Sequence, residues 1–409
     1  MLRGNVPSLE HPCGQRGWGC PPLWRGREPG GGELSAPRLR TGAPERAGLD
    51  PGELRRLVRE VRQLTTGERP WAPGVVVAAG RGPVLAVHEA AGHAVRYAAY
   101  DPEADAGVEL PAAERVPVTV DTPFDLASLT KLFTAVAAVQ QIERGTLGID
   151  GQVGAYLPEF RAAARYGITV RALLTHTSGL RPELPLYDCA TDAHRLALLR
   201  SEAPTGPPGE YRYSDLNLLL LQHVLERVTG RSLDLLIHDG ITRPLGMTST
   251  RFGPCPDAAA TEDQRRPWAK ADRGMVRGEV HDENAWVLGG VAGHAGLFST
   301  ARDLAVFCRA LLAGGSYGPA RILGPDFVDL MLTPPGLGFA LDQRWFMGEL
   351  AGSGAAGHTG FTGTSLVVDR ATDTFLVLLA NTVHPRRRTP DSRPRAQAAS
   401  RVAWAVRGV

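Results

Sequence analysis

The chain has 409 residues, with 45 Lys and Arg against 43 Asp and Glu, and its formal net charge is +2. This near balance argues against a nucleic-acid-binding protein and against a basic protein of the membrane surface. Hydrophobic residues make up 43% of the chain, enough for an ordinary buried core. No apolar run reaches the roughly 18 residues that a membrane-spanning helix needs, so we expect no membrane span.

The N-terminal segment differs in composition from the rest of the chain. It is rich in Gly and Pro and has no apolar periodicity, so we predict a disordered tail over residues 1–44 and a folded domain over residues 45–409. The apolar centre of a signal peptide is missing, and we therefore expect a cytoplasmic protein. The five cysteines form no C-x-x-C pair, which argues against a zinc ribbon and a disulfide framework. The Arg-rich stretch Arg386–Arg407 is interpreted as the solvated face of a terminal helix.

The pattern of the folded region predicts strands at both ends and helices between them. Two β-rich runs near each end flank a short turn segment, as in a hairpin, and apolar runs closed by glycine predict the helices. We therefore predict an α+β fold, in which helices flank an antiparallel sheet built from both chain termini and a helical lobe is inserted. The predicted elements, in chain order, are a helix capped by Asp50, strands Val75–Ala79 and Val84–His88, helices Ala127–Arg144, Val170–Leu174, Leu216–Val228 and Thr300–Ala313, and strands Ser365–Asp369 and Thr374–Ala380.

Ser128 and Lys131 are three residues apart at the start of a strongly apolar predicted helix, so their side chains share one face. A serine hydroxyl becomes a good nucleophile when a base takes its proton, and a lysine with a lowered pKa can be that base. The alternative is a capping serine beside a solvated lysine.

Tyr213 and Asp215 lie at a predicted junction between a loop and a helix, after a Pro-rich turn. A phenol near a lysine cation can have a lowered pKa and shuttle protons. The alternative is that Asp215 caps the following helix while Tyr213 packs.

The Gly-rich segment Gly357–Gly363 directly precedes a predicted strand. Its glycines allow close approach to a substrate, and its backbone N–H groups can complete an oxyanion hole. The alternative is a turn with an exposed His358.

In this order, the three segments resemble the S-x-x-K, Y-x-N and K-T-G motifs of the penicillin-recognising serine hydrolases, which include class C β-lactamases, DD-peptidases and related esterases. The matching positions are Ser128–Lys131, Tyr213–Asp215 and His358–Gly360. Two departures stand out, because Asp215 replaces the family's Asn and His358 replaces its Lys. A neutral His358 weakens recognition of a β-lactam carboxylate, and its protonation is expected to strengthen the binding of anionic substrates.

A further block resembles a branch of this family that is linked to bacterial cell-wall recycling. It contains His281, Asp282 and Asn284, which the resemblance places in a substrate groove, and a Gly-rich loop over that groove, Gly289–Gly296, with His294. The alternative is that His281 and His294 only hold loops through hydrogen bonds. No ligand spacing supports a zinc site, so we expect no metal.

The resemblance implies a serine hydrolase in which Ser128 attacks a carbonyl, Lys131 takes its proton and Tyr213 relays the proton to the leaving group. It also implies that the backbone N–H groups of Ser128 and Phe361 hold the oxyanion, and that Asp215, His358, Thr359 and Gly360 contact the substrate. We expect no cofactor, and an amide or ester substrate of small-molecule or peptidoglycan-derived origin. The alternatives are an esterase or β-lactamase, or a penicillin-binding sensor without turnover. The sequence does not indicate an oligomeric state.

Overall fold

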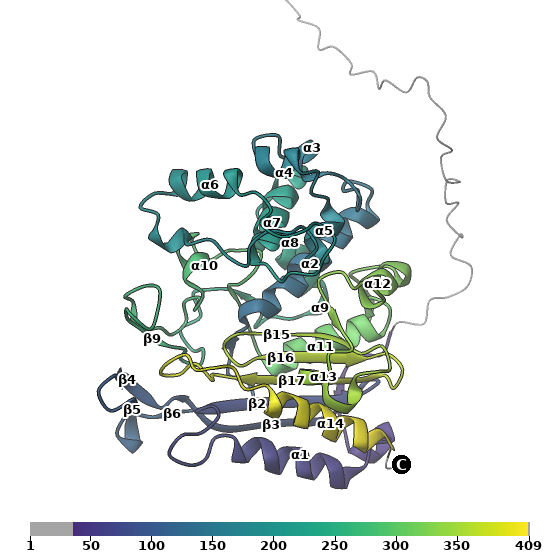
Figure 1. The fold of residues 1–409 in the computed structure, drawn as a ribbon. Coiled ribbons are helices and arrows are strands. Elements are labelled where there is room, and N and C mark those ends of the chain that lie inside the picture. The colour runs from purple at the N-terminus through teal and green to yellow at the C-terminus, as the bar shows by residue number, and fades with distance from the viewer. Residues whose placement is uncertain (1–35, 408–409) are drawn as a thin grey trace, which may run out of the picture. The chain divides into compact units, whose positions relative to one another are not determined.

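The structure, a computed structural model, describes residues 36–407, and its main sheet joins strands from both ends of this region (Figure 1). The strand order is β1-β3-β2-β17-β16-β15-β14, and β6 adds to β3. All neighbours are antiparallel except β1 and β3. The two ends meet where β2 pairs with β17, with Val77 opposite Leu378. The predicted α+β fold with a sheet from both termini is confirmed. The strands are β1 Arg40–Thr41, β2 Gly74–Arg81, β3 Val84–Val95, β6 Val116–Pro117, β14 Ala340–Leu341, β15 Ala356–Thr359, β16 Ser365–Asp369 and β17 Thr374–Ala380.

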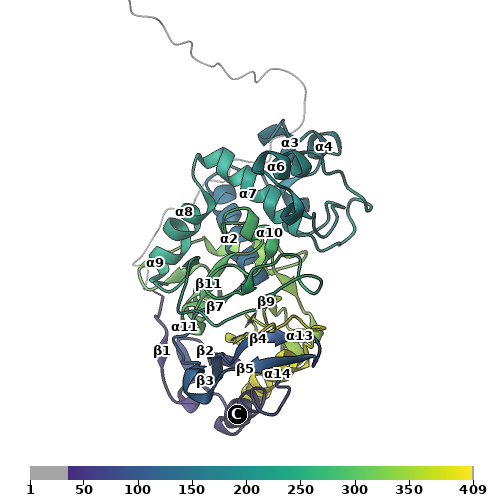
Figure 2. The ribbon, with the colours of Figure 1, turned by 90° about the vertical axis from the view of Figure 1, so that its left-hand side faces the viewer.

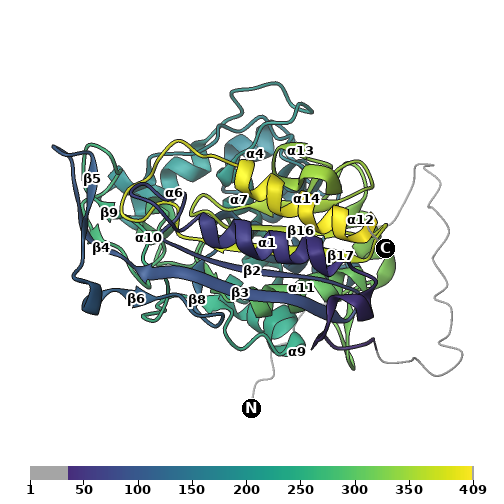
Figure 3. The same ribbon diagram turned by 90° about the horizontal axis from the view of Figure 1, so that it is seen from below.

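Apolar side chains on both faces of this sheet form two separate cores. In β2, Val75 and Val77 face one core while Val76 and Ala78 face the other, because successive side chains of a strand point to opposite sides. Helices α1 (Pro51–Gln63) and α14 (Arg393–Arg407) cover the first face and lie side by side across the strands (Figure 3). Helix α11 (Ala301–Leu312) packs on the other face.

Helix α2 (Thr130–Glu143) is buried along nearly its whole length and follows a 3-10 turn at Ala127–Leu129. Figure 2 shows it between the helical lobe and the short strands β7 (Phe124–Asp125) and β11 (Leu297–Ser299). The remaining helices are α3 Val153–Tyr156, α4 Arg161–Arg165, α5 Val170–Leu174, α6 Asp192–Ser201, α7 Asp215–Thr229, α8 Leu233–Ile237, α9 Arg243–Leu245, α10 Glu283–Val287, α12 Pro325–Leu332 and α13 Arg344–Met347. The remaining strands are β4 Tyr97–Asp101, β5 Ala106–Glu109, β8 Arg251–Phe252, β9 Asp263–Gln264, β10 Gly274–Met275, β12 Ser316–Tyr317 and β13 Ala320–Arg321.

The ordered region begins earlier than the predicted boundary at residue 45. Leu39 is buried in a core, Arg40 N donates to Pro83 O at 2.8 Å, and Gly42 N donates to Leu85 O at 3.2 Å. The end of the predicted tail, residues 36–44, therefore belongs to the folded body, and the rest of that tail, residues 1–35, lies outside the described residues. Among the helices of residues 36–407, none is long and apolar enough to cross a membrane.

Candidate active site

Ser128 is placed by a sharp turn at the end of β7. The carboxylate of the buried Asp125 accepts hydrogen bonds from Ala127 N at 2.8 Å and from His281 N at 2.6 Å. Ala127 has a φ of +46°, a conformation that non-glycine residues seldom adopt and that packing must hold in place. The turn delivers Ser128 to the N-terminal end of α2, the most deeply packed helix of the site.

The structure brings the three predicted catalytic residues together. Lys131 Nζ donates to Ser128 Oγ at 2.9 Å, and the Tyr213 hydroxyl donates to the same oxygen at 2.9 Å. Lys131 Nζ also lies 5.0 Å from the centre of the Tyr213 ring. A nucleophile within hydrogen-bond reach of two proton-carrying groups has the geometry that acyl transfer requires.

Lys131 lies in a negative environment that favours its charged form. Its side chain is 1% exposed, and Nζ is 2.8 Å from Asp215 Oδ1 and 3.1 Å from the carbonyl oxygen of His294. The Asp215 contact is an ion pair. Burial alone lowers the pKa of an ammonium group, but the charge of Asp215, followed by Tyr213, outweighs it and raises the pKa of Lys131 above its ordinary value. Lys131 is therefore an ammonium group at neutral pH.

Asp215 does not cap α7, because Ser214 occupies the N-cap position and Asp215 is the first helical residue. Its carboxylate faces Lys131 instead, so the alternative interpretation of this position is wrong.

Tyr213 is supported by His176, a residue to which the sequence assigned no role. The two rings stack with centroids 4.8 Å apart, and His176 Nδ1 lies 3.1 Å from Ser214 N and 3.0 Å from Asn217 Nδ2. Burial and the charge of Lys131 lower the pKa of His176 to about 3, so the ring is neutral and accepts hydrogen bonds. Burial raises the pKa of the Tyr213 phenol, although Lys131 opposes this.

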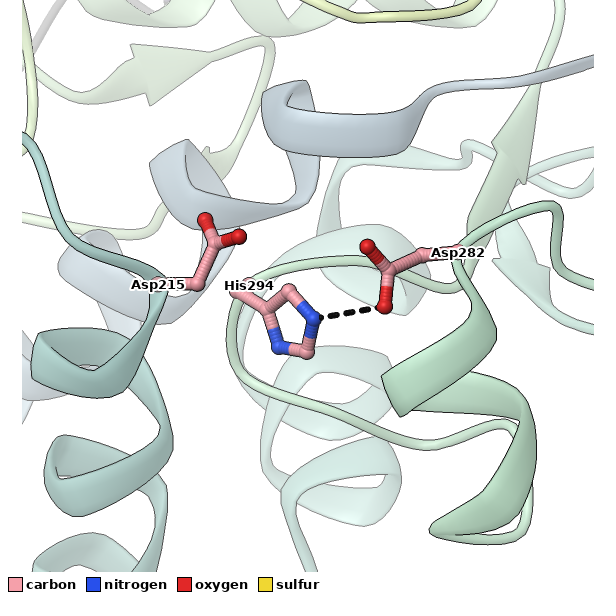
Figure 4. Close-up of side chains that lie close together, drawn as sticks. All are labelled: Asp215, Asp282 and His294. Atoms are coloured by element: carbon pink, nitrogen blue, oxygen red, sulfur yellow. Dashed lines mark hydrogen bonds and ion pairs between the residues drawn. The ribbon is translucent and has the colours of Figure 1, made fainter. Parts of the chain in front are cut away.

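His294 and Asp282 lie close to Asp215 (Figure 4). His294 Nε2 lies 2.9 Å from Asp282 Oδ1, and its Nδ1 is buried without a hydrogen-bond partner. Burial opposes the charge of Asp282, but His294 outweighs it, so the pKa of the Asp282 carboxyl is lowered. One ligand-type atom from each of Asp215, Asp282 and His294 lies within 4.8 Å of the others. The positive charge beside this group is the ammonium of Lys131.

The segment that carries His294 is fixed directly to α2. Thr134 Oγ1 donates to Gly293 O at 2.8 Å, and Leu297 N donates to Thr130 Oγ1 at 3.2 Å. These bonds fix the position of the His294 carbonyl oxygen, which accepts a hydrogen bond from Lys131 Nζ.

The predicted segment His358–Gly360 lines one side of a pocket of about 410 Å³ that also contains Ser128 and Tyr213. His358 Nδ1 donates to Thr359 O at 2.7 Å, and burial together with the charge of Lys131 lowers the pKa of His358 to about 4. His358 is therefore neutral at pH 7 and gives the pocket no cation. Aromatic rings form much of the remaining wall, namely Tyr211, Trp345, Phe346 and Phe361.

The turn after β15 is fastened to the chain just before Ser128. Thr362 Oγ1 donates to Asp125 O at 2.7 Å, and Thr364 Oγ1 donates to Leu126 O at 3.1 Å. Phe361 lies in this turn, 47% exposed, and its ring stacks on His281 with centroids 5.7 Å apart. Ser128 and Phe361 line the same pocket, and the oxyanion hole formed by their backbone N–H groups stays a prediction.

This pocket is not lined by four of the predicted substrate-binding residues, namely Asp215, His281, Asp282 and Asn284. His281 is buried and its Nε2 lies 2.8 Å from Glu262, which leaves its ring as a support for Phe361. Asn284 is buried as well, accepting from Tyr187 N at 3.2 Å and donating to Leu184 O at 2.8 Å. The side chains of His281 and Asn284 hold loops together, as the alternative interpretation for His281 expected.

Arg395 is a pocket residue that the sequence interpretation missed. It lies on α14, is buried, and donates from Nη2 to Gly360 O at 3.0 Å and from Nη1 to Ser392 Oγ at 3.1 Å, while its Nε has no partner. Burial lowers the pKa of Arg395 to about 10, which still leaves a cation at neutral pH.

The Arg-rich end is therefore not a uniformly solvated helical face. Besides Arg395, Arg387 departs from that interpretation, because it precedes α14 and pairs with the buried carboxylate of Glu262 at 2.7 Å.

Comparisons with known proteins agree with this geometry. A sequence model of the family described as Beta-lactamase matches residues 54–400. A protein of Escherichia coli strain K12, named "Putative D-alanyl-D-alanine carboxypeptidase", is 29% identical over 398 residues, covering 88% of this chain and 89% of the relative.

Solved structures show the same fold. A penicillin-binding protein homologue from Caulobacter crescentus superposes with a TM-score of 0.66 at 22% identity, covering 88% of this chain and 98% of that one. EstCE1, described as a hydrolase with promiscuous acyltransferase activity, superposes with a TM-score of 0.63 at 24% identity, covering 86% and 98%. Because the family match spans nearly all of the described residues and includes the Ser128, Lys131 and Tyr213 group, the chain belongs to the Beta-lactamase family and is a serine hydrolase.

Proposed function

We propose that the chain hydrolyses an amide or ester bond of a peptidoglycan-derived substrate through an acyl-enzyme on Ser128. The observation that carries the proposal is the pair of hydrogen bonds, both 2.9 Å, that Lys131 and Tyr213 donate to Ser128 Oγ in the pocket. The name of the Escherichia coli relative supports a cell-wall peptide as the substrate class.

The proton route follows from the charge of Lys131. An ammonium group can accept the Ser128 proton only if it gives one away, and Asp215, 2.8 Å from Nζ, is its acceptor. As Ser128 Oγ bonds to the carbonyl carbon, its proton moves to Lys131 while Lys131 passes one to Asp215. The extra proton on this pair balances the charge of the oxyanion.

Collapse of the tetrahedral adduct breaks the bond to the leaving group, which takes its proton from the Tyr213 hydroxyl. Tyr213 then recovers a proton from the Lys131–Asp215 pair. In deacylation the same groups act in reverse order on a water molecule, which releases the acid and restores Ser128. The backbone N–H groups of Ser128 and Phe361 stabilise the oxyanion in both halves.

The pocket favours a substrate with a carboxylate next to the scissile bond. His358 is neutral, so the cation that lines the pocket is Arg395, whose Nε lacks a partner. A guanidinium recognises a carboxylate through fixed N–H donors. A terminal D-amino acid and a β-lactam both carry such a group, whereas a simple ester does not.

Intact-mass spectrometry with penicillin, a chromogenic ester and muropeptides tests the proposal. We expect an acyl adduct and released product in the wild type, and neither in Ser128→Ala. Ser201→Ala, an exposed serine at the end of α6, serves as the matched control and should behave as the wild type. Tyr213→Phe removes only a hydroxyl and should lower turnover by about 10²–10⁴-fold.

Each alternative has its own outcome in this experiment. A persistent penicillin adduct without product indicates a sensor, and turnover of esters alone indicates an esterase. Wild-type hydrolysis by Ser128→Ala would overturn the assignment of the nucleophile.

A further inference from the structure

The active-site pocket does not end at Arg395. A second hollow of about 320 Å³ begins there and shares Phe361, Pro390 and Arg395 with the pocket that holds Ser128. The second hollow also contains Trp71 and Arg388. Because these residues line both, the two hollows are adjacent, and we refer to the adjacent hollows as the groove.

The groove continues into a third hollow of about 600 Å³. Arg69, Arg388 and Thr389 line both the second and the third hollow. The third hollow has mixed charge, since it also contains Glu68, Asp105 and Glu109 besides further arginines.

The second hollow is lined by three arginines, Arg69, Arg388 and Arg395, and by one carboxylate, Asp391. Its Arg69 lies 3.8 Å from Asp105, and its Asp391 lies 2.8 Å from Arg393, so these charges have partners. Within residues 36–407, neither Arg388 nor Arg395 forms an ion pair with a carboxylate.

The hydrogen bonds of these two arginines go to neutral groups. Arg388 donates to Pro70 O at 3.4 Å, and Arg395 donates to Gly360 O and Ser392 Oγ. Arg395 is buried, whereas Arg388 is exposed. Burying a guanidinium without an anion is unfavourable, so Arg395, with the exposed cation of Arg388 on the same hollow, favours an anionic ligand.

The walls of this hollow suit a peptide better than a compact ion. The Trp71 indole lies beneath Arg395, with the guanidinium carbon 5.8 Å from the ring centre, and the exposed Phe361 ring stands at the border of the two hollows. Aromatic side chains pack against the apolar stem of a residue whose charged end reaches an arginine.

We propose that the second hollow is a subsite for a carboxylate that a peptide substrate carries beyond its scissile bond, held by Arg388 next to Arg395. This inference rests on the proposed function for the peptide nature of the substrate. It adds that the residue after the scissile bond carries a second carboxylate on its side chain, and that this second negative charge separates good substrates from poor ones.

A matched pair of synthetic peptides tests the subsite. The two share the same scissile bond and differ only in Glu or Gln at the position beyond it. We expect the wild type to prefer the Glu peptide about tenfold or more in kcat/KM, mainly through KM, since a charge-assisted hydrogen bond accounts for a difference of that size. In Arg388→Gln this preference should fall to near one. Arg161→Gln, an equally charge-changing variant at an exposed position of α4 that lines neither hollow, should keep the wild-type preference.

Binding measurements separate failure of this inference from failure of the proposed function. Titration of Ser128→Ala with both peptides needs no turnover, and the Glu peptide should bind about tenfold more tightly, with a difference that shrinks as salt is added. Equal dissociation constants overturn the subsite even if Ser128 is the nucleophile. A preserved difference in an enzyme that hydrolyses neither peptide overturns the proposed reaction and leaves the subsite standing. An unchanged preference in Arg388→Gln removes Arg388 from the recognition of the carboxylate.

Discussion

Asp215 lies 2.8 Å from Lys131 and forms an ion pair inside the catalytic group. In the motif that this segment resembles, the corresponding residue is a neutral Asn. The carboxylate therefore adds a negative charge beside the lysine, and its strongest effect is on the protonation of Lys131, whose pKa is raised. The proposed proton route depends on this contact, and we expect part of the stability of the site to depend on it as well.

Asp215→Asn should lower kcat about 10²–10⁴-fold with a smaller effect on KM, because the terminal acceptor of the Ser128 proton is lost. It should also lower the free energy of unfolding at pH 7 by about 1–3 kcal/mol. The pKa of Lys131 is raised in the folded state, so its stabilising contribution is complete below the unfolded pKa of about 10.5 and is lost as pH rises through the folded pKa. The stability difference between variant and wild type should therefore shrink above about pH 10.5.

Steady-state kinetics and denaturant unfolding at pH 7 and above pH 10 measure these effects. Asp192→Asn makes the same chemical change at an exposed carboxylate at the start of α6 and serves as the control. It should change neither kcat nor the free energy of unfolding. A wild-type kcat in Asp215→Asn would show that Asp215 takes no part in proton transfer.

His358 should not make the recognition of anionic substrates pH-dependent near neutrality. Burial lowers the pKa of His358 to about 4, so its ring changes charge well below neutral pH and below the ordinary pKa of histidine. This revises the expectation that protonation of His358 strengthens anion binding near pH 6.5. The ratio of kcat/KM for an anionic and a neutral substrate should stay constant from about pH 6 to 8 and change only near pH 4. A ratio that falls steadily between pH 6 and 8 would restore His358 as the anion-binding group.

Three buried histidines should make the protein lose stability in mild acid. The pKa values of His176, His358 and His384 are lowered to about 3, 4 and 3, mainly by burial. The unfolded chain binds protons on these residues below about pH 6.5 while the folded chain does not. Stability is therefore complete above that pH and falls as pH decreases toward the folded pKa values, by up to about 1.4 kcal/mol per pH unit for each histidine.

Urea unfolding at several pH values between 7 and 4.5 measures this slope. His384→Gln should reduce the slope of the free energy of unfolding against pH by the contribution of one histidine. His238→Gln, at an exposed position, should leave this slope unchanged. Equal slopes in the two variants would contradict the assignment of a neutral buried His384.

Glu262 is a fully buried carboxylate between two loops, and its removal should be strongly destabilising. It lies 2.8 Å from His281 Nε2 and 2.7 Å from Arg387 Nη2, and these partners lower its pKa to about 2 against the effect of burial. Glu262→Gln removes the negative charge that balances the guanidinium of Arg387. It should therefore lower the free energy of unfolding by about 3–5 kcal/mol. Glu89→Gln, which affects an exposed pair with Arg62, should change the free energy of unfolding by less than about 1 kcal/mol. Similar stabilities of both variants would show that the Glu262 network is not stabilising.

Removal of residues 1–42 should lower the melting temperature by several degrees relative to removal of residues 1–35. The longer truncation deletes β1 and the buried Leu39, together with the bonds to Pro83 and Leu85. Burial of a leucine stabilises a protein by about 1.5–3 kcal/mol. Thermal melts of the two truncated chains, with matched buffers, measure the difference. Equal melting temperatures would mean that β1 adds nothing to the stability of the sheet.

Much of the fold could be predicted because local patterns and tertiary structure agree. The strands Ser365–Asp369 and Thr374–Ala380 have the predicted bounds, and Asp50 caps α1 by accepting from Glu53 N at 3.2 Å. The β1 strand escaped prediction because two residues give no pattern of their own, and only the pairing with β3 orders them.

The candidate site, like the fold, could be predicted only in part. Ser128 and Lys131 share a face of one helix, so their proximity follows from spacing, while the approach of Tyr213 came from the motif resemblance. The inward position of Arg395 and the charged state of Lys131 depend on groups far away in the chain, Gly360 and Asp215. The local sequence around these arginines does not indicate which of them is buried.

The pairing of β2 with β17 has a consequence for how the protein is made. Val77 lies opposite Leu378, so nearly the whole chain must leave the ribosome before β2 acquires its neighbour on that side. Until then β2, whose side chains are apolar toward both faces, has one open edge, and such strands are prone to join other chains. Long-range pairing of this kind also folds slowly. Synthesis that stalls before residue 374 would therefore leave a chain that carries Ser128 and Lys131 but depends on chaperones to stay out of aggregates.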